Sequence, residues 1–238
     1  MLPSDFEARF ERLQERIASA AARAGRNPEE VRLVSVTKSH PPEVIQGAYE
    51  AGLRDFGENR VSELLEKQEV LDLSDARWHF VGRIQRRKVK KLIGQSALIH
   101  SVDRLSLAQE LSKRGDAAAI VSNGLLQVNT SGEESKGGWE VYHPEGRERF
   151  FSEVETILAL PAIRLHGLMT MAPFYDEPER MRPAFRAVHD LQRELTARFP
   201  GHLWEILSMG MTNDFEVAIE EGATHIRVGT ALFGPREY

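Results

Sequence analysis

VRLVSVTKSHPPEVIQGAYEAGLRDFGENR, residues 31–60, contains a complete strand–helix–strand unit. Its first part, 31–38, is a β-branched apolar run that ends in Lys38, and 54–59 is a second strand candidate. Between the two, 41–52 opens with two prolines, which cannot continue a strand but suit the first turn of a helix. A helix that joins two such strands predicts a parallel βαβ unit.

The same alternation continues to the end of the chain. Short apolar segments end in polar residues or glycine, and amphipathic stretches separate them. The strand candidates are 31–38, 54–59, 78–82, 98–103, 125–130, 165–170, 206–210 and 226–229. The helices expected between them are 41–52, 60–70, 84–94, 104–114, 148–159, 178–198 and 213–221. This pattern predicts an α/β protein with a single (β/α)8 TIM barrel, whose functional residues lie at the C-terminal ends of the strands.

We expect one domain over residues 1–238. The composition shifts nowhere sharply enough to mark a boundary, and the length is usual for one α/β barrel. Apolar residues recur every three or four positions over about 4–24, which predicts an opening helix. After the eighth strand only TALFGPREY (230–238) remains, too little for a full crossover helix. The opening helix is therefore expected to complete the outer ring.

Composition narrows the class of protein. Hydrophobic residues make up 41% and charged residues 28%, as in ordinary globular proteins. The sequence has no apolar run of about 18 residues that would span a membrane, and its N-terminus lacks the apolar stretch of a secretory signal. The absence of cysteine fits a cytoplasmic location, and a net charge of −5 gives no general attraction to nucleic acid. We expect neither a membrane nor a nucleic-acid partner.

Lys38 is the first candidate for chemistry. A lysine that closes an apolar strand at a barrel mouth is partly desolvated, which lowers the pKa of its amine and favours attack on a carbonyl group. Lysines at strand ends are also commonly exposed to solvent. For this residue alone, simple exposure is the more economical interpretation.

Two turns that contain glycine follow the seventh and eighth strands, LSMGM (207–211) and IRVGTALFG (226–234). Ser208 offers a hydroxyl group, while Gly229 and Thr230 offer backbone amides and a second hydroxyl. Barrels commonly bind a phosphate group at this place, with backbone N–H groups and a short helix N-terminus. Glycine and serine are also frequent in ordinary turns, so the phosphate site is one of two interpretations.

Arg227 favours the phosphate-containing ligand. It lies inside the apolar eighth strand, and a buried arginine needs a partner. The pyridine nitrogen of pyridoxal 5′-phosphate (PLP) is one possible partner, because arginine is among the residue types found there. An internal ion pair with a strand-end acid, Glu58 or Asp103, is the alternative.

Seven segments together carry a family resemblance. They are VSVTK with Lys38, FGENRVSE (56–63), WHFVGRIQRRK (78–88), IHSVDR (99–104), QVNTSGEESKGG (127–138), HGLMTMAP (166–173) and LSMGMTNDFEVAIEEGATHIRVGTALFGPREY (207–238). In order and in spacing, from about residue 31 to the end, they resemble the YggS/PROSC family of PLP homeostasis proteins. The resemblance implies a fold-type III PLP protein, a single barrel similar to the N-terminal domain of bacterial alanine racemase but without its C-terminal β-domain.

The resemblance also implies a set of cofactor-binding residues. They are Lys38, which holds PLP as a Schiff base, Asn59 beside the cofactor, Arg227 at the pyridine nitrogen, and Ser208, Gly229 and Thr230 at the phosphate. Members of the family control intracellular pools of free PLP and amino acids and have no established catalytic turnover. This implies a PLP carrier or regulator that works in the cytoplasm.

Three features remain open. Where many family members have WHFIGPLQSNK, this chain has WHFVGRIQRRK, and the basic run 86–91 could attract an anionic ligand or an acidic partner; a solvated basic face is the simpler interpretation. Lys136, in the loop SGEESKGG, could receive PLP in a transfer step, although an exposed loop lysine is again simpler. His79 and His166 are interpreted as packed polar residues, since no metal-binding spacing accompanies them.

A PLP-dependent amino-acid racemase is the alternative function. Racemisation needs acid–base groups on both faces of the substrate, and Lys38 supplies only one. In the racemase architecture the second is a tyrosine from a separate β-domain, whereas this sequence stops at Tyr238, and neither it nor Tyr49, Tyr142 and Tyr175 has a signature for that role. We therefore expect a non-catalytic protein, a monomer whose partners are PLP and, transiently, apo-PLP enzymes.

Overall fold

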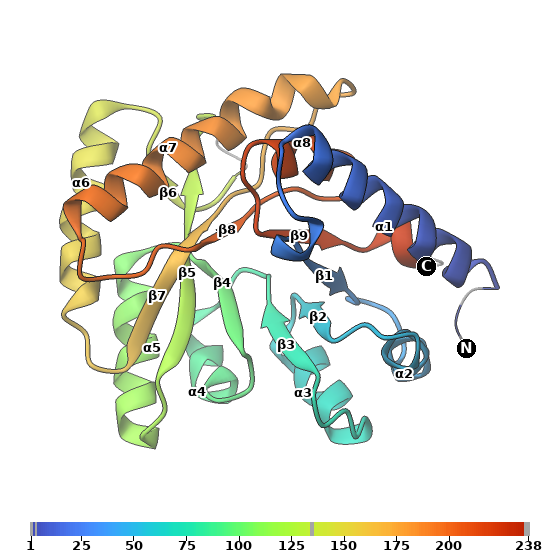
Figure 1. Cartoon of the computed structure of the whole chain (residues 1–238). Coiled ribbons are helices and arrows are strands. Elements are labelled where there is room, and N and C mark those ends of the chain that lie inside the picture. The colour runs from blue at the N-terminus through green and yellow to red at the C-terminus, as the bar shows by residue number, and fades with distance from the viewer. Residues whose placement is uncertain (1, 3, 134–135, 236–238) are drawn as a thin grey trace.

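The apolar segments form parallel strands that pair in a closed ring (Figure 1). The computed structural model describes residues 2, 4–133 and 136–235. The barrel strands are β1 (Arg32–Val36), β2 (Asp55–Glu58), β3 (Arg77–Phe80), β4 (Leu98–Val102), β5 (Ser122–Asn129), β7 (Ile163–Met169), β8 (Ile206–Ser208) and β9 (His225–Val228). β1 pairs with both β2 and β9, and β4 pairs with β5, so the sheet closes. The predicted (β/α)8 barrel is confirmed.

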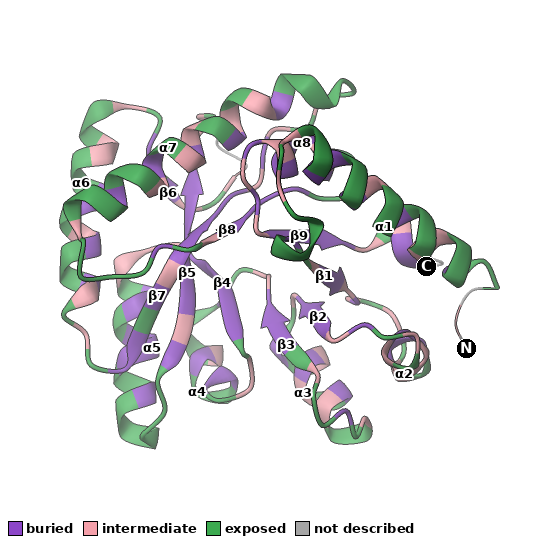
Figure 2. Ribbon diagram, viewed as in Figure 1, coloured by how far each residue is buried: buried purple, intermediate pink, exposed green. Residues whose placement is uncertain are grey.

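Helices surround this ring and cover it with their apolar faces. They are α1 (Phe6–Arg23), α2 (Pro42–Glu50), α3 (Val61–Val70), α4 (Val89–Leu92), α5 (Leu105–Ala118), α6 (Pro144–Leu158), α7 (Arg182–Arg198), α8 (Phe215–Glu220) and α9 (Thr230–Phe233). Three 3-10 turns, η1 (Pro28–Glu30), η2 (Arg86–Lys88) and η3 (Pro178–Met181), accompany them. Figure 2 shows the strands almost entirely buried, whereas the helices expose their outer sides.

The segment after β3 departs from the expected helix. In place of a continuous helix over 84–94, the chain forms η2 and the short α4, and only Val89 and Leu92 of α4 are buried. Basic side chains fill most of 86–91, and like charges three or four positions apart destabilise a helix. The amphipathic pattern alone therefore overestimated this helix.

Two of the small elements that were not expected lie near the barrel mouth. A short strand, β6 (Trp139–Glu140), pairs with β5 outside the ring, between the strand expected over 125–130 and the helix expected over 148–159. The last residues of the described chain form α9 directly after β9. Both elements lie at the C-terminal ends of barrel strands, where they add backbone around the barrel mouth.

The opening helix α1 packs against α8 and α9 (Figure 1). Arg16 and Glu216 form an ion pair at 2.6 Å across the α1–α8 contact. The rings of Phe6 and Phe233 stack with their centroids 5.8 Å apart and join α1 to α9. These contacts hold the first helix of the described chain against its last two helices, beside the first and last strands of the barrel.

Gly167 marks the closest approach of β7 to β8. Its φ is +150°, and a Cβ atom added there would lie 1.9 Å from the carbonyl oxygen of Ile206. Because neighbouring strands in a closed barrel cannot separate without disturbing the ring, this position tolerates no side chain.

We expect Gly167→Ala to lower the free energy of unfolding by about 3 kcal/mol or more, since the backbone must move to admit the methyl group. Urea denaturation measures the change. Gly201→Ala is the matched control, because nothing lies within 4 Å of a Cβ added there, and its stability should stay within about 0.5 kcal/mol of wild type. Equal stability of the two variants would contradict the close approach of the strands.

Candidate functional site

A pocket of about 450 Å³ opens at the C-terminal ends of the barrel strands. Its lining residues are Val36, Lys38, Asn59, Val81, Gly82, Arg83, Met171, Ala172, Pro173, Phe174, Met181, Met211, Thr212, Asn213, Asp214, Arg227, Gly229 and Thr230. They follow β1, β2, β3, β7, β8 and β9, so segments far apart in the sequence meet here. Lys38, Asn59, Arg227, Gly229 and Thr230, all proposed from the sequence, lie together in this lining.

Arg227 is a buried cation between the pocket and the barrel interior. Arg227 lies within β9, and the residue is 6% exposed. Nη1 donates a hydrogen bond to Ser208 Oγ at 2.6 Å, and Nη2 donates to the carbonyl oxygen of Thr170 at 2.9 Å. Burial lowers the pKa of Arg227 to about 10, while the charge of Asp214 acts in the opposite direction. The guanidinium is thus held by neutral acceptors at the pocket wall.

Both acids considered as ion-pair partners of Arg227 are engaged elsewhere. Glu58 is fully buried and lies 2.6 Å from Lys67 Nζ. Asp103 pairs with Arg104 and lies 3.6 Å from Arg83. Among the described residues no carboxylate forms an ion pair with Arg227, so the internal pair that the sequence left open does not form.

Ser208 lies beneath the pocket and does not line it. It is fully buried at the end of β8, and its Oγ accepts the bond from Arg227 and lies 2.8 Å from His100 Nδ1. The hydroxyl group is therefore engaged inside the barrel. In this structure Ser208 contacts the site through Arg227, and its role in phosphate binding stays a prediction.

The backbone on either side of Lys38 is held by a buried polar cluster. Thr37 Oγ1 donates to Glu58 Oε1 at 2.6 Å, and Lys67 Nζ donates to the Thr37 carbonyl oxygen at 2.9 Å. Ser39, the next residue, adopts a positive φ of 65°. Such a conformation is uncommon outside glycine. The chain therefore turns sharply directly after Lys38, at the edge of the pocket.

Two helices begin beside the pocket, α8 after Asp214 and α9 after Gly229. The first N–H groups of any helix have no intrahelical acceptor, and the helix dipole favours an anion near them. A Cβ atom added to Gly229 would lie 3.0 Å from the carbonyl oxygen of Val36, so glycine keeps β9 close to β1. This corner of the pocket suits a phosphate group.

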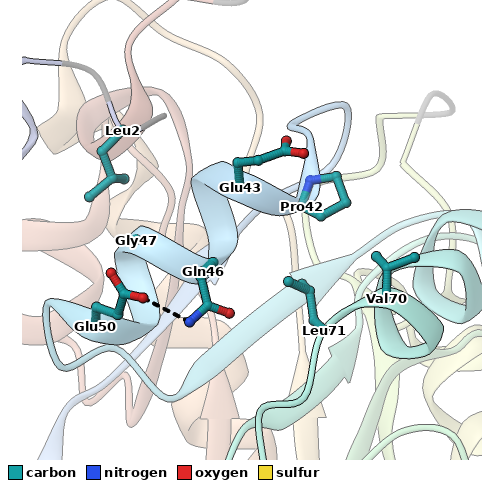
Figure 3. Close-up of a pocket in the computed structure, with 8 residues that line it drawn as sticks. All are labelled: Leu2, Pro42, Glu43, Gln46, Gly47, Glu50, Val70 and Leu71. Carbon is teal, nitrogen blue, oxygen red and sulfur yellow. Dashed lines mark hydrogen bonds between the residues drawn. The ribbon is translucent and has the colours of Figure 1, made fainter.

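A larger hollow of about 670 Å³ lies outside the barrel, between the N-terminal segment, α2 and the end of α3 (Figure 3). Its lining residues are Leu2, Pro42, Glu43, Gln46, Gly47, Glu50, Val70 and Leu71. The side chains are apolar, amide or acidic, and Gln46 donates to Glu50 at 2.9 Å (Figure 3). Without a lysine or arginine in its lining, this hollow does not suit a phosphorylated aldehyde.

The basic run and Lys136 lie apart from the pocket lining. Lys136 is 3.9 Å from Glu133 within its loop, and its backbone carbonyl accepts a bond from Asn129 at 3.3 Å. In the run 86–91, Arg86 pairs with Glu110 at 3.1 Å on the outer surface. Neither feature belongs to the lining of this pocket, and their proposed roles in PLP transfer and in anion binding stay predictions.

The two histidines named from the sequence have polar partners. His79 is buried between His100 and Asp55, at 2.9 and 2.8 Å. His166 lies 2.9 Å from the side-chain oxygen of Asn123. In the described part of the chain, no cluster of three or more side chains has the arrangement of a metal site. Likewise, none of the helices described there is both long and apolar enough to cross a membrane.

The described tyrosines do not belong to the pocket lining. Tyr49 on α2 is hydrogen-bonded to Asp75, and Tyr175 lies under the guanidinium of Arg180 at 4.2 Å. Tyr142 is 47% exposed. Tyr238 falls outside the described residues. No tyrosine of the described chain lines the pocket that holds Lys38.

The fold and this site define a class of protein. The family model described as the alanine racemase N-terminal domain matches residues 9–237. The solved alanine racemase of Clostridium difficile has the same fold, with a TM-score of 0.69 and 15% identity over 95% of this chain and 57% of the racemase. The barrel is thus of the alanine racemase N-terminal-domain class.

Similarity to curated relatives is greater. A pyridoxal phosphate homeostasis protein of Aquifex aeolicus is 48% identical over 97% of this chain and 98% of its own length. The Pseudomonas aeruginosa protein of the same name is 44% identical over 94% and 92%. PipY of Synechococcus elongatus, solved with PLP bound, has a TM-score of 0.79 and 36% identity over 93% of this chain and 99% of PipY. The chain therefore belongs to the family of pyridoxal phosphate homeostasis proteins, as its sequence motifs indicated.

Sequence patterns did not identify all the residues that shape the site. Asp214 lines the pocket, and its carboxylate accepts a hydrogen bond from the N–H of Met211 at 2.5 Å. Burial raises the pKa of Asp214, although this bond and the charge of Arg227 act in the opposite direction. His100 lies below Arg227 and contacts Ser208. Asp214 in TNDFE has the position of a helix N-cap, which was a usable signal. His100 had no such signal, because its partners lie on other strands.

The buried pair of Glu58 and Lys67 yields a stability test. Burial raises the pKa of Glu58, although Lys67 and Thr37 act in the opposite direction, and Glu58 Oε2 is buried without a hydrogen-bond partner. Lys67→Met should lower the free energy of unfolding by about 3 kcal/mol, because Glu58 loses its cation. The double variant with Glu58→Leu should recover much of the loss, since apolar groups can replace such a pair. In urea titrations, a double variant no more stable than the single one would refute this view.

Proposed function

We propose that this chain binds PLP in the pocket at the C-terminal ends of its barrel strands and acts in PLP homeostasis as a non-catalytic carrier. The observation that carries the proposal is the set of donors in that one pocket: the Lys38 amine, the Arg227 guanidinium and the helix start at Gly229–Thr230. PLP has an aldehyde, a ring nitrogen and a phosphate group, which match these three donors in kind. The relative PipY has been solved with PLP bound, which supports PLP as the ligand.

Each donor has a role in this proposal. The Lys38 amine forms the Schiff base that holds the cofactor aldehyde. Arg227 donates a hydrogen bond to the ring nitrogen, while Gly229 and Thr230 hold the phosphate group. Ser208, also expected at the phosphate, has its hydroxyl engaged by Arg227 and His100 and serves the site through Arg227. Asn59 lies beside the cofactor. When bound, PLP supplies an electrophilic carbon conjugated to a ring, and an arginine at the ring nitrogen leaves that nitrogen unprotonated, which makes the ring a weaker electron sink.

The pocket supports holding the cofactor better than turning over a substrate. A racemase needs an acid–base group opposite the lysine, and the described lining offers no tyrosine or histidine. The carboxylate that does line the pocket, Asp214, is bonded to the N–H of Met211. An amine that forms a Schiff base reversibly can bind and release an aldehyde, which is the chemistry that a carrier requires.

The proposal extends to the cellular setting. The protein acts in the cytoplasm as a monomer, with PLP as its ligand and apo-PLP enzymes as transient partners. The curated relatives carry names that describe homeostasis and no enzymatic reaction. This supports a function in controlling the supply of the cofactor.

Replacement of Lys38 tests the cofactor site. PLP-loaded wild-type protein should show a Schiff-base absorbance band near the edge of the visible range, and Lys38→Ala should lose it because the amine is gone. Lys136→Ala is the matched control and should keep the band, since Lys136 does not line the pocket. A band that survives in Lys38→Ala and disappears in Lys136→Ala would move the site to the loop.

Transfer of the cofactor tests the carrier function. Loaded protein is mixed with an apo-PLP enzyme in the presence of a trap for free PLP, and the activity of that enzyme is followed. We expect activation to exceed that given by the same amount of free PLP, because bound cofactor escapes the trap. A racemase activity that Lys38→Ala abolishes would instead show that the protein is an enzyme.

A further inference from the structure

A continuous line of hydrogen bonds crosses the interior of the barrel and ends at Arg227. Asp55 Oδ1 lies 2.8 Å from His79 Nε2, and His79 Nδ1 lies 2.9 Å from His100 Nε2. His100 Nδ1 lies 2.8 Å from Ser208 Oγ, which accepts from Arg227 Nη1 at 2.6 Å. We call these five residues the polar column. It joins β2, β3, β4, β8 and β9, whose side chains point to the same interior.

The polar column replaces the usual filling of a barrel. Barrel interiors are packed mostly with branched aliphatic side chains, whereas every residue of the column is no more than 6% exposed. A buried polar group costs free energy unless it is hydrogen-bonded, and a network is stable only when all its members are satisfied. Such an arrangement therefore needs a physical reason beyond packing.

The two ends of the column carry opposite charges. Asp55 also forms ion pairs with Arg77, whose Nη2 lies at 2.6 Å, and with Arg32, whose Nη1 lies at 3.2 Å. These residues lie where β1, β2 and β3 begin. Burial would raise the pKa of Asp55, but the bonds from Arg77 and His79 outweigh it and keep this carboxyl ionised. Arg227 is the cation at the other end, where the strands finish. The column thus links a carboxylate at the floor of the barrel to a guanidinium at its mouth.

The hydrogens of the column can be assigned from both ends. An arginine only donates, so Ser208 Oγ accepts from Arg227, and an ionised Asp55 only accepts, so His79 Nε2 carries a hydrogen. Burial lowers the pKa of His100, which is therefore neutral and has one N–H group. One assignment that satisfies every contact has Ser208 donate to His100 Nδ1 and His100 Nε2 donate to His79 Nδ1. All these hydrogens point toward Asp55.

Aligned donors of this kind reinforce one another. Each bond polarises the next in a medium of low dielectric constant, so a run of bonds directed from a cation to an anion is stronger than isolated pairs. The Ser208 oxygen consequently presents its lone pairs to Arg227. With Nη1 bound to Ser208 and Nη2 bound to Thr170, the orientation of the guanidinium plane at the pocket wall is determined.

From this geometry we propose that His100, supported by His79 and Asp55, positions Arg227 for its contact with the ring nitrogen of the cofactor, although none of the three touches the pocket. The inference rests on the proposed PLP site. It makes His100 a positioning residue that acts through Ser208. Loss of His100 leaves the Arg227 side chain in place but removes the constraint on the direction of its N–H groups.

A thermodynamic cycle between His100 and the ring nitrogen tests this inference. One arm is the cofactor: PLP is compared with its 1-deaza analogue, in which CH replaces the ring nitrogen. The other arm is the protein: wild type is compared with His100→Leu, and dissociation constants come from absorbance titration of the full chain. Wild type should bind PLP about tenfold or more tightly than the analogue, because one charge-assisted hydrogen bond is lost. In His100→Leu the preference should shrink to about twofold or less.

Two further variants keep the test independent of folding. His100→Gln keeps an amide near the position of Nε2, for His79, but has no acceptor at the position of Nδ1, for Ser208. This variant should reduce the preference for PLP as His100→Leu does. His225→Leu is the matched control. His225 is buried beside the same rings, 6.2 Å from His79 and 6.3 Å from His100 between centroids, but its side chain contacts Thr224 and it lies outside the column. This variant should keep the wild-type preference.

The possible results separate the two proposals. If His100→Leu and His100→Gln weaken both ligands by the same factor, His100 has a general structural role and the inference is wrong. Equal binding of PLP and its analogue by wild type would also overturn it, while PLP binding would stand. If wild type takes up neither ligand, the proposed function fails and the inference fails with it.

Discussion

The burial of a guanidinium at the mouth of the barrel is the constraint on which the rest of the site depends. Arg227 lies in a strand that is inaccessible on both faces, and none of the described carboxylates pairs with it. A charge in that position must be balanced by hydrogen bonds, by more distant charges and by a ligand. Ser208 and Thr170 supply the bonds, and Asp214 supplies negative charge from the pocket side. The pocket is the remaining side, and a ring nitrogen with a free lone pair suits it.

A buried ion pair supports the side of the pocket that contains Lys38. Lys38 follows a short strand, and the buried cluster of Thr37, Glu58 and Lys67 holds the backbone at the point where the chain turns. One wall of the pocket is therefore organised by an ion pair below the lysine, and the opposite wall by a directed line of hydrogen bonds below the arginine. Both supports lie outside the pocket, which leaves the pocket surface to the groups that contact a ligand.

Much of this arrangement follows from the sequence. All eight barrel strands were found within a few residues of their ends, because β-branched runs followed by glycine or polar residues mark them, and Lys38 and Arg227 meet because parallel strands finish at one rim. The prediction of a continuous helix over 84–94 was wrong. Apolar residues recur there at helical spacing, but the positions between them carry like charges, which destabilise a helix. The His79–His100 contact was not predictable, because it depends on the register between β3 and β4 and on which tautomer each ring adopts. The sequence also does not show whether the Ser208 hydroxyl points to a ligand phosphate or into the barrel, where the structure has it.

We propose that one amine, Lys38 at the rim of this barrel, holds the cofactor. The most direct test treats the PLP-loaded protein with borohydride, which reduces a Schiff base to a stable secondary amine, and then maps the labelled peptides by mass spectrometry. We expect the phosphopyridoxyl group on the peptide that contains Lys38. A label confined to any other lysine, with Lys38 unmodified, would contradict the account.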